Sequence, residues 1–380
     1  MTFLAQLHCA VRIRFNLAFL RIDVKLTGDR WRAGLALIAA AACTPGDAGQ
    51  PGARRGGVDL TGAGATFPYP IYSKWFDEYA TKTGVHINYQ PIGSGGGIKQ
   101  LSEETVDFGA SDAPMTDAEM AAAKGGPILH VPTVVGVVAV AYNLPSLVQP
   151  LRLTGPLVAQ IFLGEITRWS DPRITSINPG IRLPTRDILV VHRTEESGTT
   201  YIFSDYLSSV SPAWKSAPGI GKQLQWPVGL GGKGNDGVAG LVKSTPGAIG
   251  YLELAYAKQN MLPAALLQNS SGAFVPPSAA SATAAAGRAV TGVSANTDFR
   301  MSIANSPGAD AYPVVSFTWL LVYEHDRDPV KARKLTDFIR WALTDGQQDA
   351  AALEYAPLPA PLVAVLDRRL DSIAPRKVTQ

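Results

Sequence analysis

The chain has 380 residues, of which 46% are hydrophobic and 17% charged, so it is long enough for two or three domains and is too apolar to be disordered. The formal net charge is +3, but residues 1–42 hold six basic and two acidic side chains, and the remainder holds 28 basic and 29 acidic ones. Without a basic excess, nucleic acid and anionic membranes are not expected partners.

The N-terminal segment has the pattern of an export signal. Two arginines precede an apolar run over residues 33–42, which ends in small residues and is followed by Cys43. This pattern is typical of secretory signals, and the run is too short to span a bilayer. We therefore assign residues 1–43 to a signal peptide with Cys43 as a candidate lipidation site; the alternative is ordinary cleavage near Ala42. The protein is expected to be periplasmic, and anchored to a membrane if Cys43 is lipidated.

The exported part offers no disulfide and no metal site. Cys9 lies in the segment that export would remove, which leaves Cys43 as a lone thiol. The five histidines do not show metal-ligand spacing, and no cofactor motif is present. Residues 44–57 are rich in Pro, Gly and polar side chains, which predicts a flexible linker.

From residue 58 onwards, β-like runs alternate with helical stretches. Apolar runs predict strands at residues 58–61, 85–90, 106–110, 133–142, 188–191, 248–251 and 314–323. Apolar side chains at helical spacing predict helices at residues 70–83, 97–105, 201–207 and 330–343. The Val-rich run 133–142 is consistent with a strand buried on both faces, and the Ala-rich segment 279–289 fits either a helix or a loose loop. This alternation predicts an α/β fold with mainly parallel strands.

Three segments of small residues stand directly before predicted helices, at residues 62–67, 93–97 and 197–200. Each offers hydroxyls or backbone N–H groups at a helix N-terminus, which is an arrangement that binds anions. For any one segment, N-capping by Ser or Thr is the alternative. None is a nucleotide motif, because residues 62–67 lack a third Gly and residues 231–235 lack the spacing of a P-loop.

A secreted phosphate-ester hydrolase is an alternative to an anion receptor. It would use Ser197 as the nucleophile with His192 or His130 as the base. Ser197 is not surrounded by the Gly-x-Ser-x-Gly pattern of a nucleophile elbow, so this alternative lacks support from a motif. The aromatic side chains are expected in the core rather than as platforms for a sugar ligand.

Six segments together resemble the periplasmic phosphate-binding protein of bacterial phosphate ABC importers. They are GAGATFPYPIYSKW, GSGGGIKQ, VDFGASDAPMT, HRTEESGTT, WPVGLGGKGNDGV and PGAIGYLELAYAKQN, and they follow the family's order and spacing from about residue 60 to about residue 358. The resemblance implies a two-lobed type II solute-binding fold, with mixed sheets flanked by helices and the ligand cleft between the lobes. We expect lobe I at residues 58–132 and 313–380, and lobe II at residues 133–312.

The resemblance also implies the ligand contacts. They fall on Thr66, Phe67, Ser94, Asp112, Arg193, Ser197, Gly198 and Thr199. Glu195 stands where the family often has an acidic partner for the arginine, and Gly95 replaces a Ser that is common in the family. Taken alone, Asp112 fits a turn or cap residue, Arg193 a surface ion pair, and Gly234–Gly237 a hairpin-type turn without a ligand contact.

A buried carboxylate at position 112 would select phosphate over sulfate. Phosphate keeps at least one proton at neutral pH and sulfate keeps none, so Asp112 would accept a hydrogen bond from phosphate and face only a like charge in sulfate. An unpaired buried polar group costs about 1–3 kcal/mol, and more when it is charged. Arg193 would present a planar fork of donors to the anion.

The implied function is that of a receptor rather than an enzyme. It would bind inorganic phosphate as a monomer, close its lobes on it, and deliver it to the permease and ATPase subunits of an ABC importer. A receptor for another tetrahedral oxyanion, the hydrolase, and an adhesion or sensing role on the same fold are the alternatives.

Overall fold

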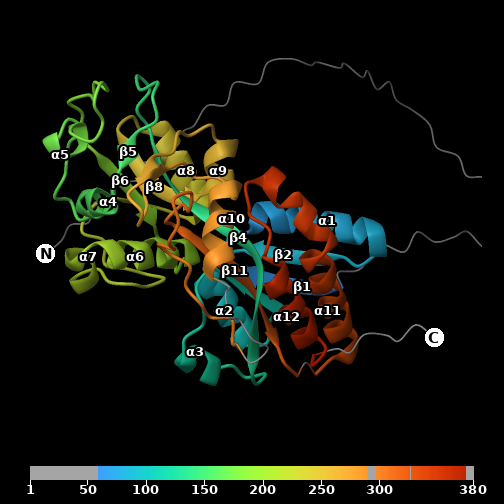
Figure 1. The fold of residues 1–380 in the computed structure, drawn as a ribbon. Coiled ribbons are helices and arrows are strands. Elements are labelled where there is room, and N and C mark those ends of the chain that lie inside the picture. Colours follow the sequence, from blue (N-terminus) through green and yellow to red (C-terminus); the bar gives the residue numbers. More distant parts are fainter. Residues whose placement is uncertain (1–58, 290–296, 326, 374–380) are drawn as a thin grey trace, which may run out of the picture. The chain divides into compact units, whose positions relative to one another are not determined.

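The computed structural model describes residues 59–289, 297–325 and 327–373 (Figure 1). The predicted signal peptide, Cys43 and the linker at residues 44–57 lie outside the described residues. The described part forms a mixed α/β fold around an eight-stranded sheet with the order β2-β1-β3-β11-β4-β8-β6-β7. This confirms the predicted α/β class.

The strands of the large sheet are β1 (Leu60–Gly64), β2 (Ile87–Pro91), β3 (Phe108–Ser111), β4 (Ile128–Tyr142), β6 (Leu189–Arg193), β7 (Leu230–Gly232), β8 (Ala248–Glu253) and β11 (Val315–Tyr323). A small sheet with the order β10-β9-β5 contains β5 (Arg152–Leu153), β9 (Leu266–Gln268) and β10 (Phe274–Val275).

The α-helices are α1 (Tyr69–Thr83), α2 (Ser94–Ser102), α3 (Asp117–Ala121), α4 (Gly155–Phe162), α5 (Pro172–Thr175), α6 (Gly198–Val210), α7 (Pro212–Ser216), α8 (Gly234–Ser244), α9 (Leu254–Gln259), α10 (Ala279–Ala289), α11 (Pro329–Leu343) and α12 (Ala360–Leu370). Two short 3₁₀ helices, η1 (Asp345–Asp349) and η2 (Ala351–Leu353), follow α11. The Ala-rich segment is therefore a helix, as one of its two interpretations predicted.

Strand β4 joins the two halves of the large sheet. Its first part pairs antiparallel with β11, from Ile128 opposite Tyr323 to Val137 opposite Val315. Its last part, Val138–Tyr142, pairs antiparallel with β8. We call β2, β1, β3, β11 and the first part of β4 the first half, and the last part of β4 with β8, β6 and β7 the second half. All 15 residues of β4 are buried, which confirms the prediction from its Val-rich sequence.

The large sheet is mixed, as the resemblance implied, although the alternation of strands and helices alone predicted mainly parallel strands. Within the halves, β1 runs parallel to β2 and β3, and β6 runs parallel to β7 and β8. The pairs that β4 and β11 make are antiparallel, because β11 runs back alongside the strand that carried the chain into the second half. A long strand that is buried on both faces has the same continuous apolar sequence as a buried parallel strand. The sequence pattern therefore did not distinguish the two.

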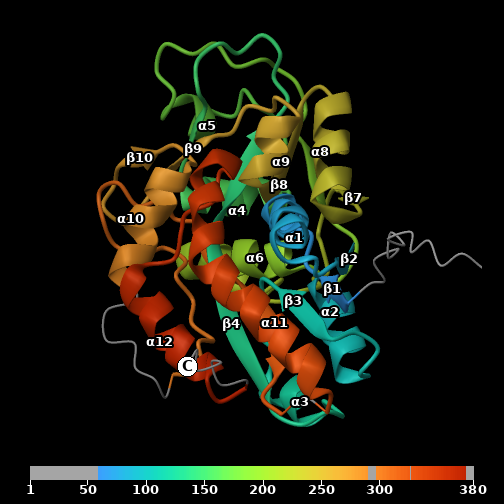
Figure 2. The ribbon, with the colours of Figure 1, turned by 90° about the vertical axis from the view of Figure 1, so that its right-hand side faces the viewer.

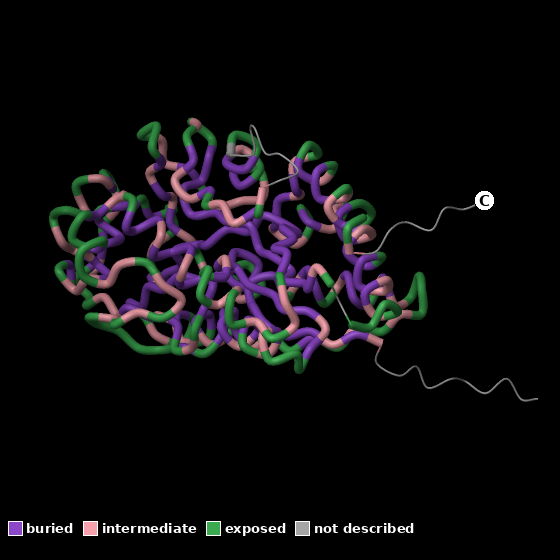
Figure 3. The backbone as a smooth tube through the Cα atoms, turned by 90° about the horizontal axis from the view of Figure 1, so that it is seen from below, coloured by how far each residue is buried: buried purple, intermediate pink, exposed green. Residues whose placement is uncertain are grey.

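Amphipathic helices cover the sheet. Helices α1 and α11 lie side by side against the first half, and α4, α6 and α8 surround the second (Figures 1 and 2). Apolar side chains recur at helical spacing in α1 and form one face of the helix. On this face the centroid of the Phe76 ring lies 5.4 Å from that of the Phe338 ring of α11. The helix ends at Gly84, whose positive φ supports a left-handed C-cap. Buried segments run through the interior of the molecule, and exposed residues lie at its periphery (Figure 3).

Two glycine-rich segments form other structures than predicted. Gly62 and Gly64 belong to β1 rather than to a turn before α1. A side chain at either position would overlap β3 at Phe108 or Ala110, so this strand requires glycine there. The segment Gly234–Gly237 forms the first turn of α8 rather than a hairpin; Lys233 is the N-cap, and the positive φ of Gly234, 71°, is one that glycine adopts readily. Helix α2 likewise begins at Ser94, three residues before the predicted start, so its small residues lie within its first turn.

Candidate functional site

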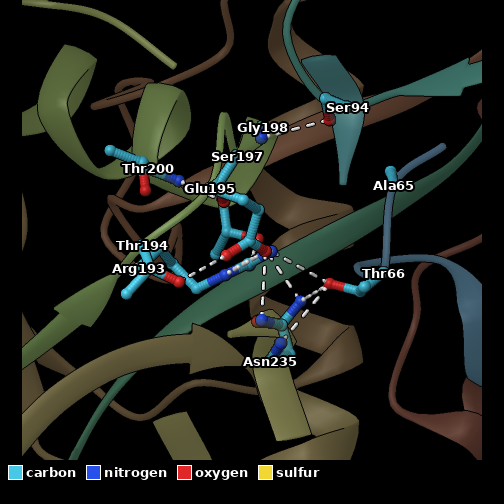
Figure 4. A network of polar contacts seen from close by, with 12 residues as sticks. Ala65, Thr66, Ser94, Arg193, Thr194, Glu195, Ser197, Gly198, Thr200 and Asn235 are labelled. Atoms are coloured by element: carbon cyan, nitrogen blue, oxygen red, sulfur yellow. Dashed lines mark hydrogen bonds and ion pairs between the residues drawn. The ribbon is translucent and has the colours of Figure 1, made fainter. Parts of the chain in front are cut away.

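The sequence-predicted site residues lie together where the two halves of the sheet meet, and Figure 4 shows Thr66, Ser94 and Arg193 among them. Thr66 and Phe67 follow β1, Asp112 follows β3, and Arg193 ends β6. All eight predicted ligand contacts are buried: Thr66, Phe67, Ser94, Asp112, Arg193, Ser197, Gly198 and Thr199. The carboxyl ends of neighbouring parallel strands are where open α/β sheets bind ligands. The fold therefore gathers these residues in a position that suits a small ligand.

Arg193 connects the two halves. Its Nη1 donates to Thr199 Oγ1 at 3.1 Å, and its Nη2 donates to Thr66 Oγ1 at 3.3 Å. Its Nε donates to Glu195 Oε1 at 3.0 Å, and its Nη2 pairs with the same oxygen. The Arg193 side chain is only 1% exposed, so this is not the surface ion pair that Arg193 alone would have suggested. The guanidinium is a buried fork that spans the site.

Glu195 remains charged beside the arginine. Burial raises the pKa of its carboxyl, but the positive charge of Arg193 and its hydrogen bond, together with the Gly234 N–H, outweigh burial and hold that pKa below its ordinary value. The Gly234 N–H donates to Glu195 Oε1 at 3.0 Å. The carboxylate thus orients the guanidinium and offsets its charge.

The Ser94 hydroxyl is held between both halves. Its Oγ accepts hydrogen bonds from the Asp112 N–H at 3.2 Å and from the Gly198 N–H at 3.1 Å. A serine hydroxyl has two lone pairs and one proton, so with both lone pairs used its O–H is left to donate. Gly198 must be glycine here, since a Cβ would lie 2.5 Å from Ser94 Oγ and 2.6 Å from Asp112 Oδ2.

Asp112 is a buried acid rather than a local turn or cap residue. It is 1% exposed, and its Oδ1 accepts a hydrogen bond at 2.7 Å from the Thr318 hydroxyl, which comes from β11. Burial raises the pKa of Asp112 to about 7, although the Thr318 hydrogen bond, the charge of Arg193 and Ser94 all act to lower it. The carboxyl can therefore exchange a proton near neutral pH.

Tyrosine hydroxyls fix the first turn. The carbonyls of residues 65–67 accept hydrogen bonds, in that order, from Tyr89 (2.8 Å), Tyr256 (2.7 Å) and Tyr355 (2.6 Å). Each carbonyl shares a planar trans peptide with the next N–H, which must point the opposite way. Within the described residues, the N–H groups of residues 66 and 67 donate no hydrogen bond. They are available to an anion.

The start of α6 combines a cap with close packing. Ser197 is the N-cap, and its Oγ accepts from the Thr200 N–H at 3.2 Å, so its side chain does what the N-capping alternative predicted. The Gly95 N–H donates to the Glu196 carbonyl at 3.1 Å. A side chain at Gly95 would overlap that of Glu196, so this glycine lets α2 approach the loop before α6.

The hydrolase alternative finds no catalytic pair in the described part of the chain. His130 Nε2 accepts a hydrogen bond from the Met115 N–H at 3.0 Å, and His192 Nδ1 lies 3.0 Å from the Arg193 carbonyl. No hydrogen bond joins either ring to Ser197 among the described residues. Among the same residues, no cluster of three or more His, Cys, Asp or Glu side chains is placed to hold a metal ion. The helices that the structure describes are all too short or too polar to cross a bilayer.

Two residues of the site were missed by the sequence analysis. Asn235, at the start of α8, donates from Nδ2 to Thr66 Oγ1 at 2.8 Å and to Thr199 Oγ1 at 3.4 Å. Thr318, which contacts Asp112, is one of two small hydroxyl residues, with Ser316, in the otherwise apolar run of β11, and this polarity was the available signal. The sequence pattern at Asn235 is typical of a hairpin turn and so does not reveal its position at the start of a helix.

Comparison with known proteins gives the following similarities. Residues 44–346 match the family model of the PBP superfamily domain. The chain is 46% identical to the phosphate-binding protein PstS of Xylella fastidiosa (strain 9a5c) over 312 residues, which cover 82% of this chain and 84% of that protein. It is 45% identical to PstS of Pasteurella multocida over 305 residues, covering 80% and 87%. Identity to PstS of the archaeon Methanocaldococcus jannaschii is 38% over 346 residues, covering 85% and 89%.

Solved structures share the fold at lower identity. A high-affinity periplasmic phosphate-binding protein (PfluDING) bound with phosphate superposes with a TM-score of 0.66 at 19% identity, covering 84% of this chain and 100% of that one. A phosphate-binding protein from Stenotrophomonas maltophilia gives a TM-score of 0.65 at 18% identity, covering 81% and 93%. At these identities the similarity establishes the periplasmic-binding-protein-like fold.

Proposed function

The chain belongs to the PBP superfamily and, within it, to the family of PstS phosphate-binding proteins, and from this we propose that it binds inorganic phosphate for import. The observation that carries the proposal is a buried cluster that brings together Arg193, threonine hydroxyls and the carboxyl of Asp112. The cluster is rich in donors, and because Glu195 is paired with Arg193, Asp112 is the carboxyl left to accept from a ligand. This is the donor balance that a phosphate with a single remaining proton requires.

The ligand contacts proposed are the eight residues predicted from the sequence. In this proposal, the N–H groups of Thr66 and Phe67 and the first turn of α6 donate to phosphate oxygens, helped by the positive end of the α6 dipole. The guanidinium of Arg193 supplies two further donors. Because Glu195 offsets the charge of Arg193, oriented dipoles rather than net charge would hold the anion.

Asp112 would provide the selectivity. As a carboxylate it accepts the proton of phosphate, whereas it meets a like charge in sulfate. Its burial at 1% exposure supports this role, because a solvated carboxylate would be screened from the ligand. The alternative ligand, another tetrahedral oxyanion without a proton, would meet the same repulsion.

Two lobes would close on the ligand. We place lobe I at residues 58–132 and 313–380 and lobe II at residues 133–312. Support comes from hydrogen bonds between segments of the two proposed lobes, such as Ser94 to Gly198 at 3.1 Å and Arg193 to Thr66 at 3.3 Å. A ligand that contacts both lobes favours the closed state by its differential affinity for it.

The closed protein would act as a monomeric, non-enzymatic receptor. It would deliver phosphate to the membrane permease of an ABC importer, which an ATPase subunit drives. We place it in the periplasm, with attachment to a membrane through Cys43 if that residue is lipidated. The names of the relatives as phosphate-binding proteins support a binding role.

Calorimetric titration of the exported protein, freed of bound ligand, tests the proposal. Wild type should bind one phosphate tightly and ignore sulfate, and Asp112→Asn should lose much of this discrimination. Asp107→Asn is a matched control. Asp107 precedes β3, its carboxylate accepts a hydrogen bond from the Thr61 N–H at 2.7 Å, and it does not touch the site. This control should retain both affinity and discrimination. A folded, ligand-free wild type that does not bind phosphate would overturn the proposal.

A further inference from the structure

Asn235 has a fixed orientation in the centre of the site. It is fully buried, and its Oδ1 accepts a hydrogen bond from the Glu253 N–H at 2.9 Å. The oxygen of the amide therefore faces the end of β8, and the NH₂ group must face the opposite way. There it donates to Thr66 Oγ1 at 2.8 Å (Figure 4) and to Thr199 Oγ1 at 3.4 Å. One amide thus reaches hydroxyls that come from both halves of the sheet.

This contact determines what the two threonine hydroxyls can do. Thr199 Oγ1 accepts from Arg193 Nη1 at 3.1 Å as well as from Asn235. Thr66 Oγ1 accepts from Arg193 Nη2 at 3.3 Å and from Asn235 Nδ2 at 2.8 Å, and the backbone N–H of Asn235 makes a longer contact with it at 3.4 Å. A hydroxyl has two lone pairs and one proton, so each threonine has its lone pairs occupied and keeps its proton for another partner. Arg193 and Asn235 have only protons to offer here, so neither can be that partner.

We propose that Asn235 is a positioning residue of the phosphate site, which holds the hydroxyls of Thr66 and Thr199 as hydrogen-bond donors toward the bound anion. This role rests on the proposed function. Without the side-chain amide, Thr199 regains a free lone pair, and Thr66 keeps only the longer contact with the backbone N–H of residue 235, so both hydroxyls rotate more freely among partners. Binding of phosphate must then select the donating orientation and loses affinity.

Substitutions at Asn235 test this role by affinity. Asn235→Ala should weaken phosphate binding by about tenfold, since two hydrogen bonds to the ligand lose part of their pre-organisation. Asn235→Asp should weaken it further, because the carboxylate would draw both hydroxyl protons away from the ligand and would repel the anion. If Asn235 only filled space, the order would be the reverse, since Asp has nearly the size of Asn.

A double-mutant cycle separates the positioning role from charge repulsion. Each Asn235 variant is combined with Thr199→Val, which removes one of the two hydroxyls. We expect the loss caused by either Asn235 variant to be about threefold smaller in the Thr199→Val background. Simple repulsion by the new carboxylate predicts equal losses in both backgrounds.

A buried asparagine away from the site serves as the control. Asn178 is 2% exposed and donates to the Arg152 carbonyl at 3.0 Å and to the Ile174 carbonyl. Asn178→Ala should lower the melting temperature and leave the phosphate affinity unchanged.

The outcomes are distinguishable. A folded Asn235→Ala that binds phosphate within about twofold of wild type, or losses that multiply without coupling to Thr199→Val, would overturn the positioning role while the proposed function stands. Wild type that does not bind phosphate would instead overturn the proposed function. If Asn235→Ala does not fold, Asn235→Asp decides the question, because it keeps the acceptor for the Glu253 N–H.

Discussion

Replacing Asp112 by Asn should stabilise the ligand-free protein, and the gain should grow as the pH rises. Burial raises the pKa of this carboxyl from 3.8 to about 7. The folded protein therefore holds a proton that the unfolded chain releases between about pH 4 and about pH 7. The stability that Asp112 contributes is fully present below about pH 4 and is lost as the pH rises through about 7.

The size of the effect follows from the shift in pKa. Each unit is worth about 1.4 kcal/mol, so a shift of roughly three units corresponds to about 4 kcal/mol. Asparagine resembles the neutral acid in size and carries no titratable proton. Above neutral pH the variant should therefore unfold with a free energy that is larger by up to this amount.

His130 produces the opposite slope in the same range. Burial lowers the pKa of its imidazole to about 4, and the charge of Arg300 acts in the same direction. The unfolded chain then binds more protons than the folded protein between about pH 4 and about pH 6.5, so this contribution to stability rises with pH. The two slopes partly cancel in wild type. Only the difference between wild type and Asp112→Asn isolates the aspartate.

This difference is measured by urea unfolding, which is followed by tryptophan fluorescence. The measurement is repeated at several pH values between about pH 4.5 and about pH 8.5. Thr318→Val should extend the loss of stability to higher pH, because it removes the hydroxyl that stabilises the Asp112 carboxylate and so raises the pKa of the folded state further. A difference between Asp112→Asn and wild type that stays constant with pH would refute the reasoning, since it would mean that Asp112 titrates alike in the folded and unfolded protein.

Three further predictions follow from other contacts. Gly198→Ala should abolish phosphate binding in calorimetry while the far-UV circular dichroism spectrum is retained, because its Cβ would lie 2.5 Å from the Ser94 hydroxyl oxygen of α2. An unchanged affinity would contradict this packing. Lys222→Met should speed phosphate release in stopped-flow measurements by about two- to fivefold, because it removes a partly buried ion pair with Glu119 between the proposed lobes, and an unchanged rate would show that the pair does not hold them closed. His130→Gln keeps an acceptor for the Met115 N–H and should reduce the loss of stability that urea unfolding measures below about pH 6. If stability falls with acid as in wild type, His130 is not the source of that loss.

Local pattern predicted most of the elements. The Val-rich run became β4, and the apolar spacing of residues 330–343 became α11, because both signals depend on neighbours only two to four residues apart. The same reasoning failed where glycine had a packing role. Gly62 and Gly64 look like a turn in sequence, and only the presence of β3 beside them shows why a strand needs them.

The sequence by itself therefore determined the α/β class, the main strands and helices, and, through the resemblance, the residues that lie together in the site. Tertiary structure alone decided how those residues are held. Arg193 meets Thr66 across 127 residues of chain, and Asp112 meets Thr318 across 206. Asn235 and Thr318 have no local partner that marks them as site residues. The hydrogen bonds that orient a buried site are made between ends of strands, and the order of strands in the sheet is set by the packing of the whole domain rather than by any local pattern.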